Sequence, residues 1–223
     1  FLYYTRIMTK IDHATLTARP EEEDFYHKYT EEGQGKIGAK LLDGYFKAVH
    51  QLIEATSIQK GSALEIGCGA GFSTKRLRDM LPTHVDLEAS EYVESMLPHA
   101  RNINPSVRIH QESVYDLKRK DNSLDLIFLL EVLEHLDYPD TALDEIARVL
   151  KPDGYLILGV PREPLWRVLN MARLKYVKDF GNTKGHLNHW SSRHITQFVE
   201  SHIGSIVSRK TPLPWTIVVA QKS

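Results

Sequence analysis

A glycine-rich run directly after a short apolar segment constrains this fold more than any other feature of the sequence. Residues 62–66 (SALEI) have the length and composition of a buried strand, and residues 67–71 (GCGAG) follow at once. Residues 73–81 (STKRLRDML) then show helical spacing and stop at Pro82. A strand, a glycine turn and a helix in this order place a tight loop and a helix N-terminus, which suits a carboxylate or phosphate, at the carboxyl end of a strand, where α/β sheets bind ligands.

Apolar strand segments and helical segments alternate from residue 62 to residue 160. After the first strand we expect strands at His84–Glu88, Val107–His110, Leu124–Leu130 and Tyr155–Val160, helices at Glu91–Arg101, Thr141–Leu150 and Ser192–His202, and closing strands near Ser205–Arg209 and Thr216–Ala220. Leu124–Leu130 is continuously apolar, as in a strand covered on both faces. The pattern predicts an α/β fold with a Rossmann-like, doubly wound, mostly parallel seven-stranded sheet, helices on both faces and an antiparallel last strand.

Length and composition favour one domain. The 223 residues suit a single α/β domain. Within it we distinguish a helical N-terminal arm (1–55), a cofactor-binding core (56–160), a basic insertion (161–195) and a C-terminal helix with closing strands (196–223). The net charge of −1 gives no global signal for nucleic-acid binding. Because the single cysteine excludes an internal disulfide and no apolar run approaches about 18 residues, we expect a cytoplasmic protein.

Two carboxylates sharpen the interpretation of the glycine run. A dinucleotide fingerprint needs G-x-G-x-x-G, but here the third glycine comes one residue early and Phe72 takes its place. Glu65 lies inside the first strand, where a buried carboxylate needs hydrogen bonds. Glu88 is expected to end the second strand, at the distance where an acidic side chain binds ribose hydroxyls. The alternatives are that Glu65 caps a turn and that Glu88 is a solvated strand end.

The motifs from the first strand to the fifth resemble those of one enzyme family. Residues 63–71 (ALEIGCGAG) are similar to the first motif of class I S-adenosylmethionine-dependent methyltransferases, in which E/D-x-G-x-G-x-G wraps the methionine part of the cofactor. Residues 111–117 (QESVYDL), 125–136 (DLIFLLEVLEHL) and 148–158 (RVLKPDGYLIL) are similar to the later motifs, in the same order. The resemblance implies methyl transfer with S-adenosylmethionine as the cofactor.

The resemblance also implies which residues hold the cofactor. They are Glu65, Gly67, Cys68, Gly69, Gly71 and Phe72 at the first strand, Glu88 and Ala89 at the second, Ser113 and Val114 after the third, and Glu131 and Val132 after the fourth. Ser113 stands where the family usually has an aspartate that accepts from the adenine amino group. Tyr29, in the N-terminal arm, is a candidate contact to the methionine carboxylate, with helix packing as the alternative. Cys68 is expected to pack rather than to act as a nucleophile, because the family has a small residue there.

A histidine after the fourth strand is the first candidate for the chemistry. If the acceptor is a hydroxyl, a base must take its proton, and histidine suits this role near neutral pH. His135 closes the stretch 131–135 (EVLEH), beside the expected position of the transferred methyl group. Helix capping is the alternative role for His135.

The same stretch has the chemistry of a divalent-cation site. The candidate ligands are Glu131, Glu134, His135 and His186. Ubiquinone-type O-methyltransferases and small-RNA 2′-O-methyltransferases carry a similar E-x-x-E-H with a later histidine near a tryptophan, and residues 185–190 (GHLNHW) are similar to that second element. A metal there would lower the pKa of an acceptor hydroxyl. His186 and His189 are therefore also candidate catalytic residues, and a divalent metal is a candidate cofactor.

The basic insertion is the candidate acceptor side. Residues 161–195 hold seven Lys and Arg against two acidic residues, a net charge of +5. Leu165, Leu169, Ala172 and Tyr176 share one face at helical spacing, which predicts an amphipathic basic helix. Three interpretations are open: a lid packed on the sheet, a pocket wall for an anionic acceptor, or a peripheral membrane contact through residues 164–180 that collects a lipid-like acceptor. Trp166, Tyr176 and Trp190 are candidate acceptor contacts or core residues.

The sequence thus predicts an enzyme that methylates a small-molecule or lipid-like acceptor on oxygen or nitrogen. A nicotinamide-dependent oxidoreductase shares the sheet and the acidic ribose partner, but Phe72 and Glu65 disfavour it. A non-catalytic cofactor-binding subunit is the second alternative, and the intact glycine run disfavours it.

Overall fold

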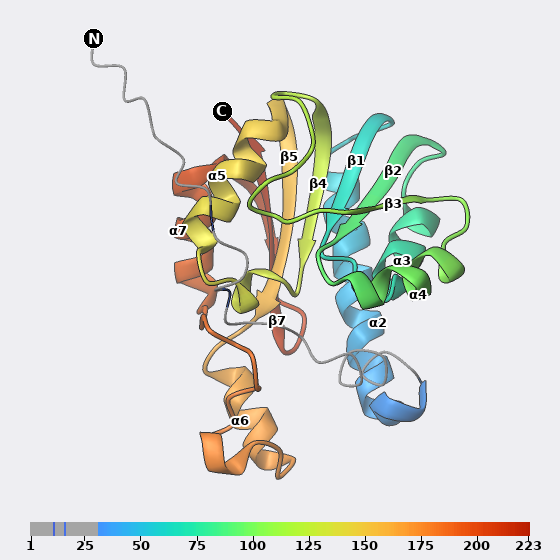
Figure 1. Cartoon of the computed structure of the whole chain (residues 1–223). Coiled ribbons are helices and arrows are strands. Elements are labelled where there is room, and N and C mark those ends of the chain that lie inside the picture. The colour runs from blue at the N-terminus through green and yellow to red at the C-terminus, as the bar shows by residue number, and fades with distance from the viewer. Residues whose placement is uncertain (1–10, 12–15, 17–30) are drawn as a thin grey trace.

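A seven-stranded sheet with the order β3-β2-β1-β4-β5-β7-β6 forms the centre of the molecule (Figure 1). It is seen in a computed structural model that describes residues 11, 16 and 31–223. The strands are β1 (Lys60–Ile66), β2 (His84–Glu91), β3 (Arg108–Gln111), β4 (Leu124–Leu130), β5 (Leu150–Pro161), β6 (Gly204–Lys210) and β7 (Trp215–Lys222). Strands β1 to β5 pair in parallel, and β7 is antiparallel to both β5 and β6. The expected doubly wound α/β fold is confirmed.

Helices cover both faces of the sheet. The α-helices are α2 (Glu31–Ala55), α3 (Phe72–Met80), α4 (Leu97–Ile103), α5 (Pro139–Val149), α6 (Leu165–Ala172) and α7 (Ser192–His202), and the short 3-10 helices are η2 (Glu94–Met96), η3 (Leu133–His135) and η4 (Val177–Asp179). Alternate residues of β4 enter opposite cores: Phe128 packs in the core with residues of α2, α3 and α4, whereas Ile127 packs with residues of α5 and α7. This alternation explains why β4 is apolar throughout.

Helix α2 is the helix of the predicted N-terminal arm within the described residues. It packs on the sheet through buried residues that include Tyr45 and Val49. Tyr29, the predicted cofactor contact in this arm, lies outside the described residues. In the described part of the chain, no helix combines the length and the apolar character needed to span a bilayer.

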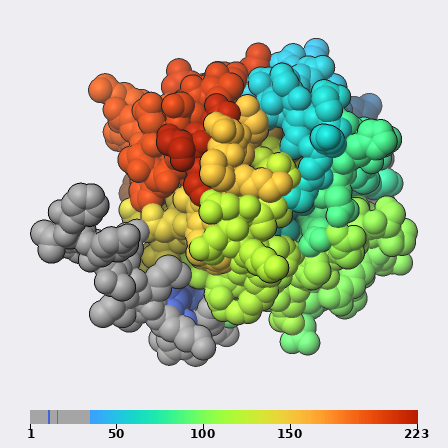
Figure 2. Space-filling view, turned by 90° about the horizontal axis from the view of Figure 1, so that it is seen from above, coloured from blue at the N-terminus to red at the C-terminus, as the bar shows by residue number. Residues whose placement is uncertain are grey.

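The strand order reverses between β1 and β4, which pair side by side in the middle of the sheet. In open α/β sheets this point opens the crevice that binds ligands, at the carboxyl ends of the strands. Strand β5 is parallel to β4, so its carboxyl end lies at the same end of the sheet as that of β4. Helix α6 follows β5 and extends from this end, below the sheet in Figure 1. At the opposite end (Figure 2), the C-terminal strand lies against the start of β5, where the Lys222 ammonium donates to the Leu150 carbonyl.

Strand β2 is longer than the sequence pattern indicated. It continues to Glu91 instead of ending at Glu88, and the helix expected from Glu91 starts only with η2 and α4. The reason is lateral pairing, because β2 pairs with β1 up to Ser90 and with β3 up to Glu91. The polar residues at its end are buried, although a polar stretch after an apolar run usually indicates a turn.

The basic insertion does not form the single amphipathic helix that we expected. Helix α6 ends at Ala172, and Leu174, Tyr176 and Phe180 have left-handed backbone conformations with φ between 51° and 55°. The cause is a return of the chain to buried Asn170, whose side-chain amide donates to the Gly181 carbonyl over 3.0 Å. We call residues 164–181 the α6 hook.

The two-sided core makes β4 the strand most sensitive to truncation. Phe128→Ala removes a fully buried ring and is expected to lower the free energy of unfolding by about 3–5 kcal/mol. Chemical denaturation followed by circular dichroism measures this. Val207→Ala, at a side chain 44% exposed on β6, is the control and should change stability by about 0.5 kcal/mol or less. Equal losses in the two variants would contradict the assignment of the core.

Candidate active site

The glycine run forms a tight loop between β1 and α3. Gly67, Gly69 and Gly71 all have positive φ angles, of 74°, 52° and 89°. A Cβ atom on Gly67 would lie 2.6 Å from a methyl group of Val132, in the turn after β4. The backbone N–H of Gly67 donates to the carbonyl of Ser90 at the end of β2. The loop is therefore held between the ends of β2 and β4, as the predicted cofactor site requires.

Glu65 is a buried carboxylate that joins β1 to α3. The Thr74 hydroxyl donates to its Oε2 over 2.6 Å, and Ser73 supplies a second hydrogen bond. Burial raises the pKa of Glu65, and the two hydrogen bonds oppose this rise only in part. The pKa is therefore about 7, above its ordinary value of 4.5. Glu65 therefore contacts the first turn of α3, and it does not cap an exposed turn.

Glu91, which we did not predict, supplies the carboxylate at the end of β2. Its Oε2 accepts from Gly69 N–H over 2.8 Å and its Oε1 accepts from Val93 N–H over 2.7 Å. The side chain is buried, and burial raises its pKa despite these backbone hydrogen bonds. The sequence pattern indicated an end of β2 at Glu88. Had the strand been extended by three residues, Glu91 would have been the acidic residue at its end. Of the acidic side chains of β2, Glu91 is thus the one that hydrogen-bonds to the glycine loop.

Glu88, the predicted ribose partner, belongs to a different set of contacts. Its carboxylate accepts from Arg108 Nε over 3.0 Å and from Arg119 over 2.9 Å, and it lies 2.9 Å from His110 Nε2. Burial raises the pKa of Glu88, but the hydrogen bonds from Arg108 and the charge of Arg119 outweigh this effect. The pKa of Glu88 is therefore below its ordinary value. The structure places Glu88 in an ion network between β2 and β3 rather than at the loop.

Four other predicted cofactor residues, in the loop, in β2 and after β3, differ in exposure. Cys68 and Ala89 are buried in the core, and burial raises the pKa of the Cys68 thiol, which agrees with a packing role. Val114 is also buried, whereas Ser113 is half-buried and its hydroxyl accepts from Tyr115 N–H over 3.2 Å. The roles of these four residues in cofactor binding stay predictions.

Phe72, the first residue of α3, is half-buried. It lines a hollow together with Leu42 and Phe46 of α2. Phe72 therefore faces a hollow between α2 and α3, and its predicted cofactor contact stays a prediction.

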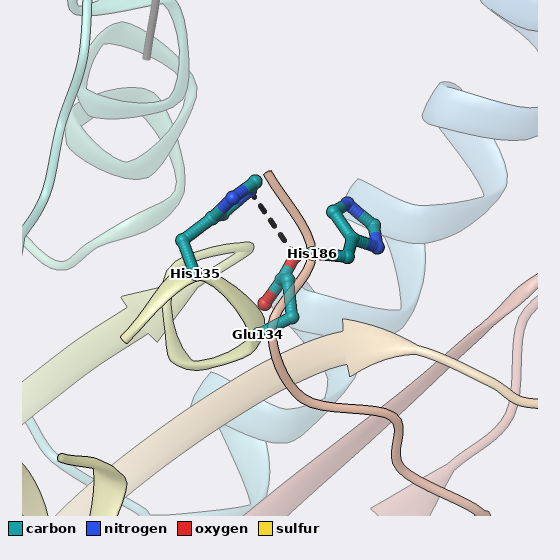
Figure 3. Close-up of side chains that lie close together, drawn as sticks. All are labelled: Glu134, His135 and His186. Atoms are coloured by element: carbon teal, nitrogen blue, oxygen red, sulfur yellow. Dashed lines mark ion pairs between the residues drawn. The ribbon is translucent and has the colours of Figure 1, made fainter. Parts of the chain in front are cut away.

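Three predicted site residues from two distant segments meet beyond β4 (Figure 3). Glu134 and His135 come from η3, and His186 comes from the loop after the α6 hook. One ligand atom from each residue lies within 4.8 Å of the others. Glu134 and His186 are buried, His135 is half-buried, and His135 Nε2 lies 4.0 Å from Glu134 Oε1. We call these residues the η3 cluster.

Backbone hydrogen bonds explain how residues about 50 positions apart form this cluster. The Glu134 carbonyl accepts from the N–H groups of both Leu187 and Asn188, over 2.8 and 3.0 Å. The Asn188 side chain donates to the Leu136 carbonyl over 2.7 Å. His135 Nδ1 donates to the Gly185 carbonyl over 2.9 Å, which leaves the lone pair of the neutral ring on Nε2.

Two other predicted residues do not join the η3 cluster. Glu131 has a φ of 59°, and its Oε2 accepts from the indole N–H of Trp215 over 2.8 Å. His189 Nε2 lies 2.7 Å from both the Arg167 guanidinium and the Asn182 amide oxygen. Burial and the charge of Arg167 lower the pKa of His189. The structure therefore brings together three of the four predicted metal ligands and two of the three predicted catalytic histidines.

A row of aromatic rings flanks the η3 cluster. Trp166 of α6 stacks on His186 with ring centroids 6.0 Å apart, and it lies 5.9 Å from the ring of Trp215. Tyr45 of α2 contacts Trp215 edge-on. Trp190, another candidate acceptor contact, packs instead on Phe198 in the core. Aromatic rings from three elements thus pack together beside the histidines, and sequence reasoning had singled out only Trp166 among them.

Known proteins identify this domain. The methyltransferase domain family matches residues 64–158, which include the glycine loop, Glu91 and η3. A probable S-adenosylmethionine-dependent methyltransferase of Mycobacterium tuberculosis is 28% identical over 132 residues, covering 58% of this chain and 47% of the relative. Residues 64–158 thus have the methyltransferase domain, and the chain is similar to S-adenosylmethionine-dependent methyltransferases over this region. The family resemblance of the sequence is thereby confirmed, and S-adenosylmethionine is the cofactor that this family uses.

Further comparisons agree on the fold. A ubiquinone biosynthesis O-methyltransferase of Xanthomonas oryzae pv. oryzae is 30% identical over 118 residues, covering 51% of this chain and 49% of the relative. The chain spans about half the length of the curated relatives it matches. A crystal structure of a methyltransferase from Aquifex aeolicus is 17% identical, with a TM-score of 0.65, over 92% of this chain and 100% of that chain. The shared fold does not by itself define the acceptor.

The residues present fit S-adenosylmethionine. Helix α3 starts without a side-chain cap, so its first N–H groups and its dipole suit the methionine carboxylate. Glu91 lies against Gly69, where a carboxylate suits the ribose hydroxyls. A Cβ on Gly67 or Gly71 would lie within 2.6 Å of a neighbouring atom, so the loop accepts no larger residue at these positions.

The buried carboxylate of Glu65 predicts a pH-dependent stability. A carboxyl group with a higher pKa in the folded state favours unfolding when it ionises, so the free energy of unfolding should fall between pH 4.5 and about pH 7. Glu65→Gln removes this loss, and the variant should gain up to about 3 kcal/mol relative to the wild type between pH 5 and pH 8. Urea denaturation without cofactor measures both proteins, and parallel pH profiles would contradict the shift.

The two acidic residues of β2 predict different effects on cofactor binding. Glu91→Gln should weaken binding of S-adenosylhomocysteine about tenfold or more, because a charged acceptor for the ribose is lost. Glu88→Gln is the matched variant and should change the affinity about twofold or less, because its partners are Arg108, Arg119 and His110. Calorimetric titration measures both, with thermal unfolding to verify folding. A larger effect of Glu88→Gln than of Glu91→Gln would instead support Glu88 as the ribose partner.

Proposed function

We propose that this protein transfers a methyl group from S-adenosylmethionine to a hydroxyl group of a small-molecule or lipid-like acceptor. The observation that carries the proposal is the η3 cluster, which follows β4 at the edge where the glycine loop lies. Val132, one residue before η3, is the residue against which Gly67 packs. The short helix that carries His135 therefore begins beside the glycine loop that is proposed to hold the cofactor.

His135 has the orientation of a general base. Its Nδ1–H donates to the Gly185 carbonyl, so Nε2 carries the lone pair that takes the hydroxyl proton. Glu134, 4.0 Å away, stabilises the imidazolium that forms. S-adenosylmethionine supplies an electrophilic methyl group on a sulfonium, and the protein aligns the acceptor oxygen with it and excludes water. The half-buried rings of Trp166 and Trp215 provide an apolar surface for the acceptor, and buried Tyr45 packs behind Trp215.

The relative from Xanthomonas oryzae, named as an O-methyltransferase of ubiquinone biosynthesis, supports oxygen as the methylated atom. A base next to the donor also favours oxygen, because a hydroxyl must lose its proton whereas a neutral amine attacks without prior deprotonation. We therefore propose O-methylation in preference to N-methylation.

A divalent cation is the second way in which the same residues would activate a hydroxyl. One carboxylate and two imidazoles are a donor set that zinc and related metals bind. Ligand atoms 4.8 Å apart would have to approach to about 4 Å or less around one ion. Glu134, His135 and His186 would hold the cation, which would lower the pKa of a bound hydroxyl.

The test combines binding with methyl transfer. S-adenosylmethionine and S-adenosylhomocysteine should both bind in a calorimetric titration and NADH should not. With radiolabelled S-adenosylmethionine, catechol should accept the methyl group and aniline should not. His135→Ala should reduce the rate about 100-fold to 10,000-fold without loss of cofactor binding. His84→Ala, at the start of β2, is the control and should leave the rate unchanged.

Treatment with EDTA separates the two ways of activating the hydroxyl. If His135 is the base, EDTA leaves the rate unchanged and His186→Ala costs less than His135→Ala. If a cation is bound, EDTA and either histidine substitution abolish transfer alike, and added zinc or magnesium restores the wild type. Binding of NADH alone would overturn the proposed function.

A further inference from the structure

The α6 hook concentrates apolar side chains on the surface. Of the twelve large hydrophobic residues that are exposed in the described part of the chain, six lie between residues 168 and 180. They are Val168, Met171, Leu174, Tyr176, Val177 and Phe180. Leu174 is 84% exposed and Phe180 is 75% exposed. This concentration of exposed apolar side chains in one short segment marks a site of interaction rather than a packed lid.

The backbone of the hook holds these side chains outward. Leu174, Tyr176 and Phe180 adopt left-handed conformations, which are rare for bulky residues and persist only where the surroundings impose them. Asn170 imposes them here, because its carbonyl accepts from Lys175 N–H and its side chain donates to the Gly181 carbonyl. The exposure of these apolar side chains is therefore imposed by the backbone structure of the hook.

The charges around these apolar side chains are mainly positive. Arg173, Lys175 and Lys178 are exposed between the apolar residues, and Asp179 is the acidic residue among them. The insertion as a whole carries a net charge of +5 in a chain with a net charge of −1. Basic groups that alternate with exposed apolar side chains complement an anionic lipid bilayer, whose headgroups attract the cations while the interface accepts the apolar groups.

We propose that the α6 hook binds the surface of an anionic lipid bilayer. The hook follows β5, and the next loop brings His186 into the η3 cluster, so a docked hook holds the candidate active site next to the bilayer. The acceptor is then a lipid-like molecule with a hydroxyl headgroup, and this second statement rests on the proposed function. The apolar residues enter the interface, and the lysines and arginine contact lipid phosphates.

Flotation of the full chain with liposomes tests the proposal. Vesicles of phosphatidylcholine with about 30% phosphatidylserine should carry the protein, pure phosphatidylcholine should carry much less, and high salt should reduce binding. Leu174→Ser and Phe180→Ser should each weaken binding about tenfold. The double variant Lys175→Gln, Lys178→Gln should lose the preference for anionic vesicles. Val207→Ser, at an exposed apolar residue of β6, is the matched control and should bind like the wild type.

Three readouts keep the outcomes distinct. Binding of S-adenosylhomocysteine must stay unchanged in the hook variants, so that a loss of vesicle binding is not a loss of folding. Methyl transfer to soluble catechol without vesicle binding overturns the docking surface but leaves the proposed function intact. Vesicle binding without any methyl transfer supports the docking surface but overturns the proposed function. A dimer in sedimentation that dissociates in Phe180→Ser, with no vesicle binding, would show that a second copy covers the hook.

Discussion

The close contact between Gly67 and Val132 is the constraint on which the rest of the site depends. Because a Cβ on Gly67 would lie 2.6 Å from a Val132 methyl group, only glycine lets the loop after β1 meet the turn after β4. That contact joins the two sides of the strand-order reversal, where the family binds its cofactor. It also relates the glycine loop, which serves the donor, to η3, which serves the acceptor.

The carbonyl of Glu134 plays the corresponding role on the acceptor side. By accepting from the N–H groups of Leu187 and Asn188, it holds the end of the insertion against η3. His186 and the α6 hook are thereby placed relative to the sheet by backbone groups rather than by side chains alone. One short turn after β4 thus connects the candidate base, the aromatic row and the proposed membrane surface.

The predictions that held were those that rest on local patterns. Apolar runs, glycines and helix stops give the class of fold and the loop, because each strand or helix carries its own periodicity. Glu91 was missed because the length of β2 depends on pairing with β1 and β3, which a single segment does not reveal. The expected basic helix failed for a similar reason, since the contact between Asn170 and Gly181 bends the chain after Ala172.

The sequence by itself determined the doubly wound sheet, the glycine loop with Glu65, and the ordered motifs that indicate the family. It also indicated His135 and His186 as chemically suited residues, but residue type says nothing about distance. Only the tertiary structure decided that His186 meets Glu134 while Glu131 turns to Trp215 and His189 to Arg167. The physical reason is that these pairs lie 22 to 84 positions apart and are positioned by sheet pairing and backbone hydrogen bonds, which local spacing does not encode.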